Sequence, residues 1–295
     1  MIRATHRRDT AVMTSLRPVT LITGASAGIG VELARVFAAH GHELVLVARR
    51  QERLNILAAE IASGSVAQGG RPPLVLALDL ARGDAAATIA DALAQAGLAP
   101  QYIVNNAGFG LVGHAATLSR GEQAEMIEVN IRTLTDLSLA FVDSLERHRG
   151  GILNVASIAA FVPGPGMAVY YASKAYVLSF SEALSAELKP RGIRVTVLCP
   201  GPVATEFAQR AGVRAGVGPG LLSVPARQVA EDGYRALMAG KRRAIPGLLP
   251  KLVVAAMALI PNALLLAAVD YRQSRRRARQ QDAGTAGSGS PASDS

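Results

Sequence analysis

A serine, a tyrosine and a lysine have spacings suited to moving a proton to or from an oxygen atom. Tyr170 and Lys174 are at positions i and i+4, so on a helix they share a face. A cation about 6 Å from a phenol is worth about 3 kcal/mol at an effective dielectric constant of about 20, or about two pKa units. We therefore expect Lys174 to lower the pKa of Tyr170 from about 10 toward about 8, where a phenol acts as a general acid or base. Ser157 precedes Tyr170 by 13 residues, and its hydroxyl can hold a reactant oxygen beside that phenol.

A glycine-rich turn follows the first apolar segment of the chain. Residues 19–23 read as a buried strand, and the sequence Gly-Ala-Ser-Ala-Gly-Ile-Gly at 24–30 leads into a helix. Glycines between a strand and a helix let the backbone approach a pyrophosphate, and the helix N-terminus offers free N–H groups to it. Glycine turns also form for packing alone, so this turn by itself only favours a nucleotide site.

These residues must be positioned by a chain in which apolar strands alternate with helices. Strands are expected at 19–23, 43–48, 74–78, 102–105, 151–156 and 193–198. Helices are expected at 28–40, 51–61, 84–96, 121–147 and 168–188. Continuous apolar strands that alternate with helices indicate a parallel sheet covered on both faces, which is an α/β fold of three layers.

Charge and cysteine content exclude several classes of protein. The net charge is +9, yet residues 18–240 hold 18 basic and 18 acidic side chains, so the excess lies at the two ends. A neutral body with basic ends does not indicate a nucleic-acid groove. The single cysteine, Cys199, excludes a disulfide framework, and we interpret it as an inert core thiol. The five histidines show no metal-ligand spacing, so no metal site is expected.

Several short motifs occur in an order that resembles the short-chain dehydrogenase/reductase family. They are Thr-Gly-x-x-x-Gly-x-Gly at 23–30, Asn-Asn-Ala-Gly at 105–108, Asn130, Ser157, Tyr170-x-x-x-Lys174 and Pro-Gly-x-x-x-Thr at 200–205. The resemblance covers about residues 18–240. It implies a single Rossmann-type domain with a doubly wound parallel sheet, and an NAD(P)-dependent oxidoreductase.

The resemblance also implies roles for the polar residues. Asn130, Ser157, Tyr170 and Lys174 are the expected catalytic residues, with Asn130 holding a water that connects Lys174 to solvent. Asn130 could instead be an exposed helix position. Tyr171 also faces Lys174 approximately, but the family spacing favours Tyr170 and leaves Tyr171 as a packing or pocket residue.

The cofactor-binding residues come from the same motifs and from the ends of the second and third strands. They are Thr23, Gly24, Ser26, Ala27, Gly28, Ile29, Gly30, Arg49, Arg50, Asp79, Leu80, Asn106, Ala107, Gly108, Tyr170, Lys174, Pro200, Gly201, Val203 and Thr205. Among them, Asn106 is expected mainly to hold backbone in place, and Asp79 is either beside adenine or a cap of the next helix.

The end of the second strand favours NADP(H) over NAD(H). That strand ends in Arg49-Arg50 without the acidic residue that an NAD enzyme uses to accept from the ribose 2′-OH. An arginine there can pair with a 2′-phosphate, and Arg49 is the first choice because it comes first after the strand. The alternative is that both arginines only face water.

The chain is divided into four regions by composition. Residues 1–17 are a basic extension, 18–247 the catalytic domain, 248–280 an apolar and basic helical segment, and 281–295 a tail expected to be disordered. Within the third region, 252–269 are apolar except for Pro261 and Asn262, which is near the length of a membrane span. Because Pro261 breaks the run and basic residues flank both ends, a hairpin on the protein or on a membrane surface is favoured.

We therefore expect an NADP(H)-dependent oxidoreductase that interconverts a carbonyl and an alcohol, with Tyr170 as acid and base. The substrate is expected to be a hydrophobic small molecule, and the protein a cytoplasmic homo-oligomer that binds no nucleic acid, with peripheral membrane contact left open. Two alternatives stay open at this point. One is a catalytically silent cofactor-binding regulator of the same fold, and the other is a peripheral membrane protein that acts through its C-terminal segment.

Overall fold

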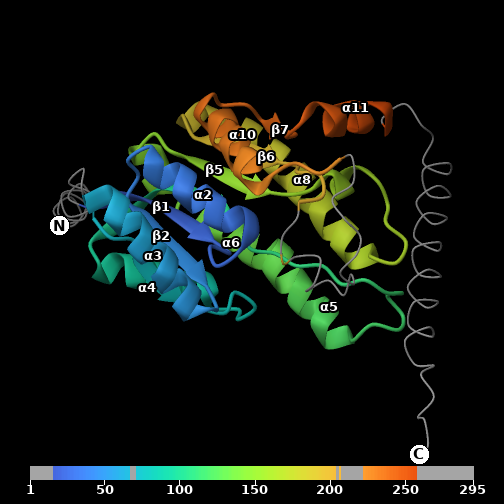
Figure 1. Cartoon of the computed structure of the whole chain (residues 1–295), viewed down its shortest axis with the longest axis horizontal. Coiled ribbons are helices and arrows are strands. Elements are labelled where there is room, and N and C mark those ends of the chain that lie inside the picture. Colours follow the sequence, from blue (N-terminus) through green and yellow to red (C-terminus); the bar gives the residue numbers. More distant parts are fainter. Residues whose placement is uncertain (1–15, 67–70, 204–205, 207–221, 258–295) are drawn as a thin grey trace, which may run out of the picture.

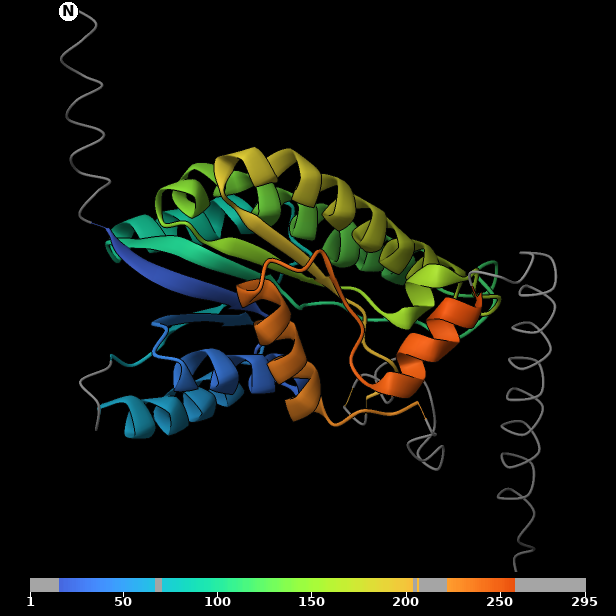
Figure 2. The same cartoon turned by 90° about the horizontal axis from the view of Figure 1, so that it is seen from above.

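The computed structural model describes residues 16–66, 71–203, 206 and 222–257. A seven-stranded parallel sheet with the order β3-β2-β1-β4-β5-β6-β7 forms its middle layer (Figures 1 and 2). The strands are β1 (Arg17–Thr23), β2 (Leu44–Ala48), β3 (Leu74–Ala77), β4 (Leu98–Asn105), β5 (Gly151–Val155), β6 (Arg194–Leu198) and β7 (Arg243–Ala244). This is the Rossmann-type, doubly wound sheet that the sequence predicts.

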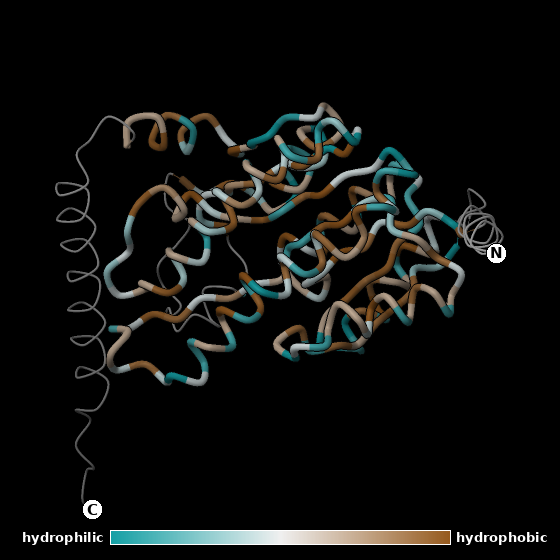
Figure 3. Tube along the Cα trace, turned by 180° about the vertical axis from the view of Figure 1, so that it is seen from behind, coloured by the Kyte–Doolittle hydropathy of each residue, from teal (hydrophilic) through white to brown (hydrophobic). Residues whose placement is uncertain are grey.

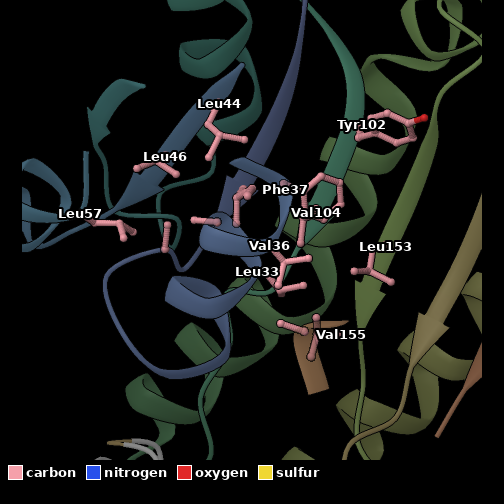
Figure 4. Close-up of a cluster of buried hydrophobic side chains, with 14 of the residues drawn as sticks. Leu33, Val36, Phe37, Leu44, Leu46, Leu57, Tyr102, Val104, Leu153 and Val155 are labelled. Carbon is pink, nitrogen blue, oxygen red and sulfur yellow. The ribbon is translucent and has the colours of Figure 1, made fainter. Parts of the chain in front are cut away.

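Helices cover both faces of the sheet. The first group of helices is α2 (Gly28–Ala39), α3 (Gln51–Val66) and α10 (Ala226–Met238). The second group is α4 (Ala85–Gln95), α5 (Arg120–Ile127), α6 (Leu134–Ala140), α7 (Val142–Arg147) and α8 (Ala168–Leu188). Phe37 of α2 packs with strand residues such as Leu46 and Val104 on the first face (Figure 4). Ile89 of α4 packs on Leu21 and Val45 on the other face, so the central strands are buried on both sides.

The fourth strand begins earlier than the sequence suggested. β4 starts at Leu98 instead of residue 102, and Pro100 lies within it. Proline lacks the N–H that a hydrogen bond between strands needs, so a proline in the sequence indicates the end of a strand. In the structure Pro100 pairs with Val19 and Tyr102 pairs with Thr20, so Gln101 is an extra residue of β4 at an irregularity directly after the proline.

The predicted continuous helix at 121–147 is wrong. A π-helical turn, η1 (Glu128–Thr133), separates α5 from α6, and a second break at Phe141 separates α6 from α7. The π turn adds a residue to the helix and brings Asn130 and Thr133 into the interior, where the Thr133 hydroxyl donates to the Leu80 carbonyl at 2.7 Å.

The C-terminal part adds elements that the sequence analysis did not specify. Strand β7 extends the sheet, α10 packs on α2, and α11 (Leu248–Met257) follows. Of the apolar segment expected at 248–280, only α11 lies within the described residues, and Pro261 lies outside them. Among the helices of the described part, none is long and apolar enough to cross a membrane.

Candidate active site

The carboxyl ends of β1, β4, β5 and β6 meet at one edge of the sheet, as they must in parallel pairing. The glycine turn leaves β1, the Asn-Asn-Ala-Gly segment leaves β4, Ser157 follows β5 and Pro200 follows β6. Segments far apart in the sequence therefore come together at this edge.

Ser157, Tyr170 and Lys174 lie together there. Ser157 caps the short 3-10 helix η2 (Ile158–Phe161), with its hydroxyl accepting from the Ala159 N–H at 3.1 Å. The Ser157 side chain also hydrogen-bonds the Tyr170 side chain. One turn further along α8, the Lys174 ammonium donates to the Val155 carbonyl at 2.9 Å and lies 5.9 Å from the centre of the Tyr170 ring. The ammonium and the Tyr170 ring are therefore neighbours, as the i, i+4 spacing predicts.

Burial decides the protonation of this group. Tyr170 and Lys174 are 8% and 4% exposed. Burial raises the pKa of Tyr170 to about 12, and the hydrogen bond from Ser157 offsets only part of that rise. Burial also lowers the pKa of Lys174 to about 8. The expected pKa near 8 for Tyr170 is therefore wrong for the protein alone, because desolvation penalises the phenolate more than its neighbours stabilise it.

Tyr171 occupies a packing position. Its ring lies so close to Gly164 that a Cβ atom built on that glycine would be 2.2 Å from a ring carbon. It meets the Tyr170 ring edge to face, with 6.0 Å between the ring centres. The Tyr171 ring thus packs on Gly164, whereas the Tyr170 side chain hydrogen-bonds the Ser157 side chain.

Asn130 is fully buried, so the alternative of an exposed helix position is wrong. Its side-chain oxygen accepts from the Phe109 N–H at 3.1 Å, and its amide donates to the Phe109 carbonyl at 3.0 Å. The same amide donates to the Ser173 hydroxyl at 3.0 Å, which in turn donates to the Tyr170 carbonyl at 2.7 Å. Asn130 therefore ties the loop after β4 to the helix that carries Tyr170 and Lys174.

The turn after β1 has the shape of a phosphate cradle. Gly24 and Gly28 have φ angles of +67° and +56°, a region that favours glycine. A Cβ atom on Gly30 would lie 2.2 Å from the Gly24 carbonyl oxygen, so only glycine lets the turn close. Ala27 precedes α2 without a side-chain cap, and the first turn of α2 holds no acid, which leaves its N–H groups available to a pyrophosphate. These residues fit a dinucleotide.

Asn106 holds that turn in place, as expected. Its side-chain amide donates to the carbonyls of Thr23 and Gly24 at 3.0 and 3.2 Å. The Thr23 hydroxyl accepts from the N–H groups of Asn106 and Ala107, both at 3.1 Å. A Cβ atom on Gly108 would lie 3.0 Å from Asn130 Oδ1 and 3.3 Å from Lys174 Nζ, so the Asn-Asn-Ala-Gly segment joins the glycine turn to Asn130 and Lys174.

The arginines at the end of β2 have acidic partners. Arg49 lies 3.9 Å from Asp79, and half of its side chain is exposed. Arg50 contacts Ser26 of the glycine turn and pairs with Glu206 at 2.7 Å, and Arg53 pairs with the same carboxylate. Both arginine side chains are about half exposed, so these pairs lie at the surface and leave open whether the arginines bind a phosphate or only cap the strand and face water.

Asp79 and Leu80, the two residues expected beside adenine, have different surroundings. The Asp79 carboxylate accepts from the Ala81 N–H at 3.1 Å, so it caps a turn and not α4, which begins at Ala85. Leu80 is a buried core residue.

The segment after β6 is described only in part. The Pro200 carbonyl accepts from the Ile158 N–H at 3.0 Å, which holds this segment beside η2. Val203 packs against the core, and Thr205 lies outside the described residues. In the described part of the chain, no group of His, Cys, Asp and Glu side chains is arranged to hold a metal.

Sequence reasoning missed Ser173 and Glu206. Ser173 lies between two expected catalytic residues, and its position in Tyr-x-x-x-Lys was the available signal. Glu206 had none, because its pairing with Arg50 joins positions 156 residues apart.

Comparisons with known proteins agree with this geometry. A family model described as short chain dehydrogenase matches residues 18–214. Sulfoacetaldehyde reductase from Chromohalobacter salexigens is 39% identical over 189 residues, which cover 63% of this chain and 72% of that relative. Dehydrogenase/reductase SDR family member 7B from Rattus norvegicus is 32% identical over 255 residues, which cover 83% of this chain and 78% of that relative.

A solved structure of a short-chain dehydrogenase from Sphingobium yanoikuyae in complex with NADPH has a TM-score of 0.70 and 32% identity, covering 83% of this chain and 97% of that chain. The family model spans more than half of this chain, and the glycine turn, Ser157, Tyr170 and Lys174 all fall inside it. The chain belongs to the short-chain dehydrogenase/reductase family, whose members are oxidoreductases acting on CH–OH groups.

Proposed function

We propose that this protein is an NADP(H)-dependent oxidoreductase that interconverts a carbonyl and an alcohol, with Tyr170 as the proton donor and acceptor. The observation that carries the proposal is the hydrogen bond between Ser157 and Tyr170, with the Lys174 ammonium 5.9 Å from the ring. A cofactor-binding regulator without catalysis needs none of these three residues together. Residues 18–247 are the proposed catalytic domain.

The side chains divide the work as follows. The nicotinamide, when bound, supplies or takes the hydride. The Ser157 hydroxyl hydrogen-bonds the substrate oxygen and holds it beside the Tyr170 hydroxyl. Tyr170 gives its proton to that oxygen in reduction, and its high pKa keeps it protonated at neutral pH. Lys174, fixed by the Val155 carbonyl, favours the phenolate that remains.

Activity of the purified full-length chain tests this proposal. Cofactor absorbance is followed with NADPH or NADH against aldehydes, ketones, sugars, steroids and acyl thioesters. The name of the Chromohalobacter relative makes sulfoacetaldehyde a comparison substrate. Apolar side chains around Tyr170, among them Phe109, Met126 and Ala159, support a hydrophobic carbonyl instead. Binding of cofactor without turnover of any of these compounds would favour the silent regulator.

Arg49 supports the preference for NADP(H), because it lies at the end of β2 with half of its side chain exposed. Arg49→Asp removes a cation and adds an anion opposite a 2′-phosphate, so NADPH affinity should fall at least tenfold while NADH affinity changes little. Arg53→Asp is the matched control, because Arg53 lies in the first turn of α3, is exposed to the same degree as Arg49, and pairs with Glu206 whereas Arg49 pairs with Asp79. Equal losses for both cofactors after Arg49→Asp would mean that Arg49 does not read that phosphate.

Two further properties are proposed on exposed apolar side chains. Self-association is supported by Ile127, Leu139 and Tyr176 on α5, α6 and α8, which are exposed by 46%, 50% and 37%. Sedimentation of the full chain measures it. Peripheral membrane contact is supported by exposed leucines of α11.

A further inference from the structure

Helix α11 has an apolar face on each side. Pro250 and Val254 point inward and are buried. Leu248, Leu249 and Leu252 are exposed by 74%, 41% and 58%. A surface helix of a globular protein normally turns polar residues outward, but the only charged residue of α11 is Lys251. Figure 3 shows this helix mostly in the hydrophobic colour.

The surroundings of α11 are basic. Residues 239–257 contain Lys241, Arg242, Arg243 and Lys251 and no acidic residue. Arg243 pairs with Glu182, whereas Lys241, Arg242 and Lys251 are exposed and make no ion pair within the described part of the chain. The turn between α10 and β7 and helix α11 both lie along the upper edge of Figure 1, and both face the viewer in Figure 2. This side of the molecule therefore carries the exposed leucines and Lys251 of α11 together with two further unpaired cations before β7, a composition that binds anionic lipid surfaces.

Helix α11 also lies beside two segments of the candidate active site. Helix α11 contacts η2, which begins directly after Ser157. Pro250 also approaches the segment after β6, where a Cβ atom on Gly201 would lie 3.5 Å from the proline ring. A surface bound by α11 is therefore next to the segments that follow Ser157 and Pro200 at the edge of the sheet that holds the candidate active site.

We propose that α11 docks on an anionic lipid bilayer through Leu248, Leu249 and Leu252, and that the enzyme takes a carbonyl or alcohol substrate that partitions into lipid. The part about substrate rests on the proposed function. A second copy of this chain fits this face less well, because two such basic surfaces would repel each other. Three leucines also offer far less area than the roughly 800 Å² per partner of a stable protein interface.

Vesicle binding of the full-length chain tests the docking surface. Sedimentation is measured with phosphatidylcholine vesicles and with vesicles that also contain phosphatidylglycerol. We expect binding to the anionic vesicles only, with weaker binding in high salt. The double variant Leu248→Ser/Leu252→Ser should lower that binding at least tenfold. Ile56→Ser is the matched control, because Ile56 is 68% exposed on α3, and it should change nothing.

Several results would overturn the docking surface. Equal binding to both kinds of vesicle removes the role of charge. Unchanged binding of the double variant places the contact in another segment, such as residues 258–280. A smaller mass for the double variant in solution makes a second copy the occupant.

Turnover separates the docking from the proposed function. With a water-soluble carbonyl, the double variant should retain wild-type rates. With a long-chain ketone in anionic vesicles, its rate should fall at least tenfold, and an equal rate would overturn substrate delivery from lipid. If the wild-type chain turns over neither substrate, the proposed function is contradicted, whereas the result on vesicle binding is unaffected.

Discussion

Replacing Tyr170 by phenylalanine removes one oxygen atom and keeps the ring. If the hydroxyl transfers the proton, the chemical step should slow by about 10²- to 10⁴-fold, which corresponds to about 3–5 kcal/mol of barrier. The hydroxyl is buried and hydrogen-bonded to Ser157, so its removal should change the free energy of unfolding by only about 1 kcal/mol. Cofactor affinity should survive, because the backbone of the glycine turn is untouched.

The adjacent tyrosine supplies the control. Tyr171→Phe keeps the ring that packs on Gly164 and against Tyr170, so we expect most of the activity to remain. Both variants are compared in single-turnover reduction of one carbonyl, followed by cofactor absorbance, with urea unfolding measured in parallel. An inactive Tyr171→Phe protein together with an active Tyr170→Phe protein would refute the assignment of the whole site.

Three further perturbations follow from the same contacts. Lys174→Met should slow alcohol oxidation and move its pH profile upward, because it removes the ammonium that lies 5.9 Å from the centre of the Tyr170 ring and favours the phenolate below about pH 8, where Lys174 is charged; lost activity with an unmoved profile would leave Lys174 only a binding role. Asn130→Ala should destabilise the protein by about 3 kcal/mol in urea, because it removes three buried hydrogen bonds, while Ser173→Ala should cost about 1–2 kcal/mol; equal losses would contradict the central place of Asn130. Burial lowers the pKa of His42 to about 4, so the unfolded chain binds more protons between about pH 6.5 and 4 and stability should fall as pH decreases through that window. Because solvent screens the partly exposed ring, we expect a loss of about 1–2 kcal/mol, and His42→Asn should flatten the unfolding profile in that window.

The sequence predicts the sheet well because its signal is local. An apolar run such as Leu44–Ala48 is buried on both faces in any register of a covered parallel sheet, so composition alone identifies it. The motif residues are equally local, since each follows a strand end and all parallel strands end at one edge. Where a local rule misled, at Pro100, the strand continues past the proline with an extra residue, Gln101, and only the pairing with β1 reveals it.

The protonation of the site could not be predicted in the same way. That Lys174 and Tyr170 are neighbours follows from helix geometry, and the ammonium lies 5.9 Å from the centre of the ring. The pKa of the phenol also depends on how much water is removed, and that is set by side chains from distant segments, including Phe109 and Met126. The spacing of the two residues predicts that Lys174 lowers the pKa of Tyr170. Burial by side chains from distant segments raises that pKa by a larger amount.

Asn130 marks the limit of the sequence argument most clearly. An asparagine in the middle of a helix is a poor helix former, which flags the position but leaves exposure and burial equally open. Once it is buried, its amide must find partners, and the π turn supplies them by pointing the side chain at the backbone of Phe109 and at Ser173. Those partners lie 21 and 43 residues away, so no window of sequence contains the contact. The break in the helix and the hydrogen bonds of the Asn130 amide arise together from tertiary packing. At the site, they hold the loop beside Lys174 in place.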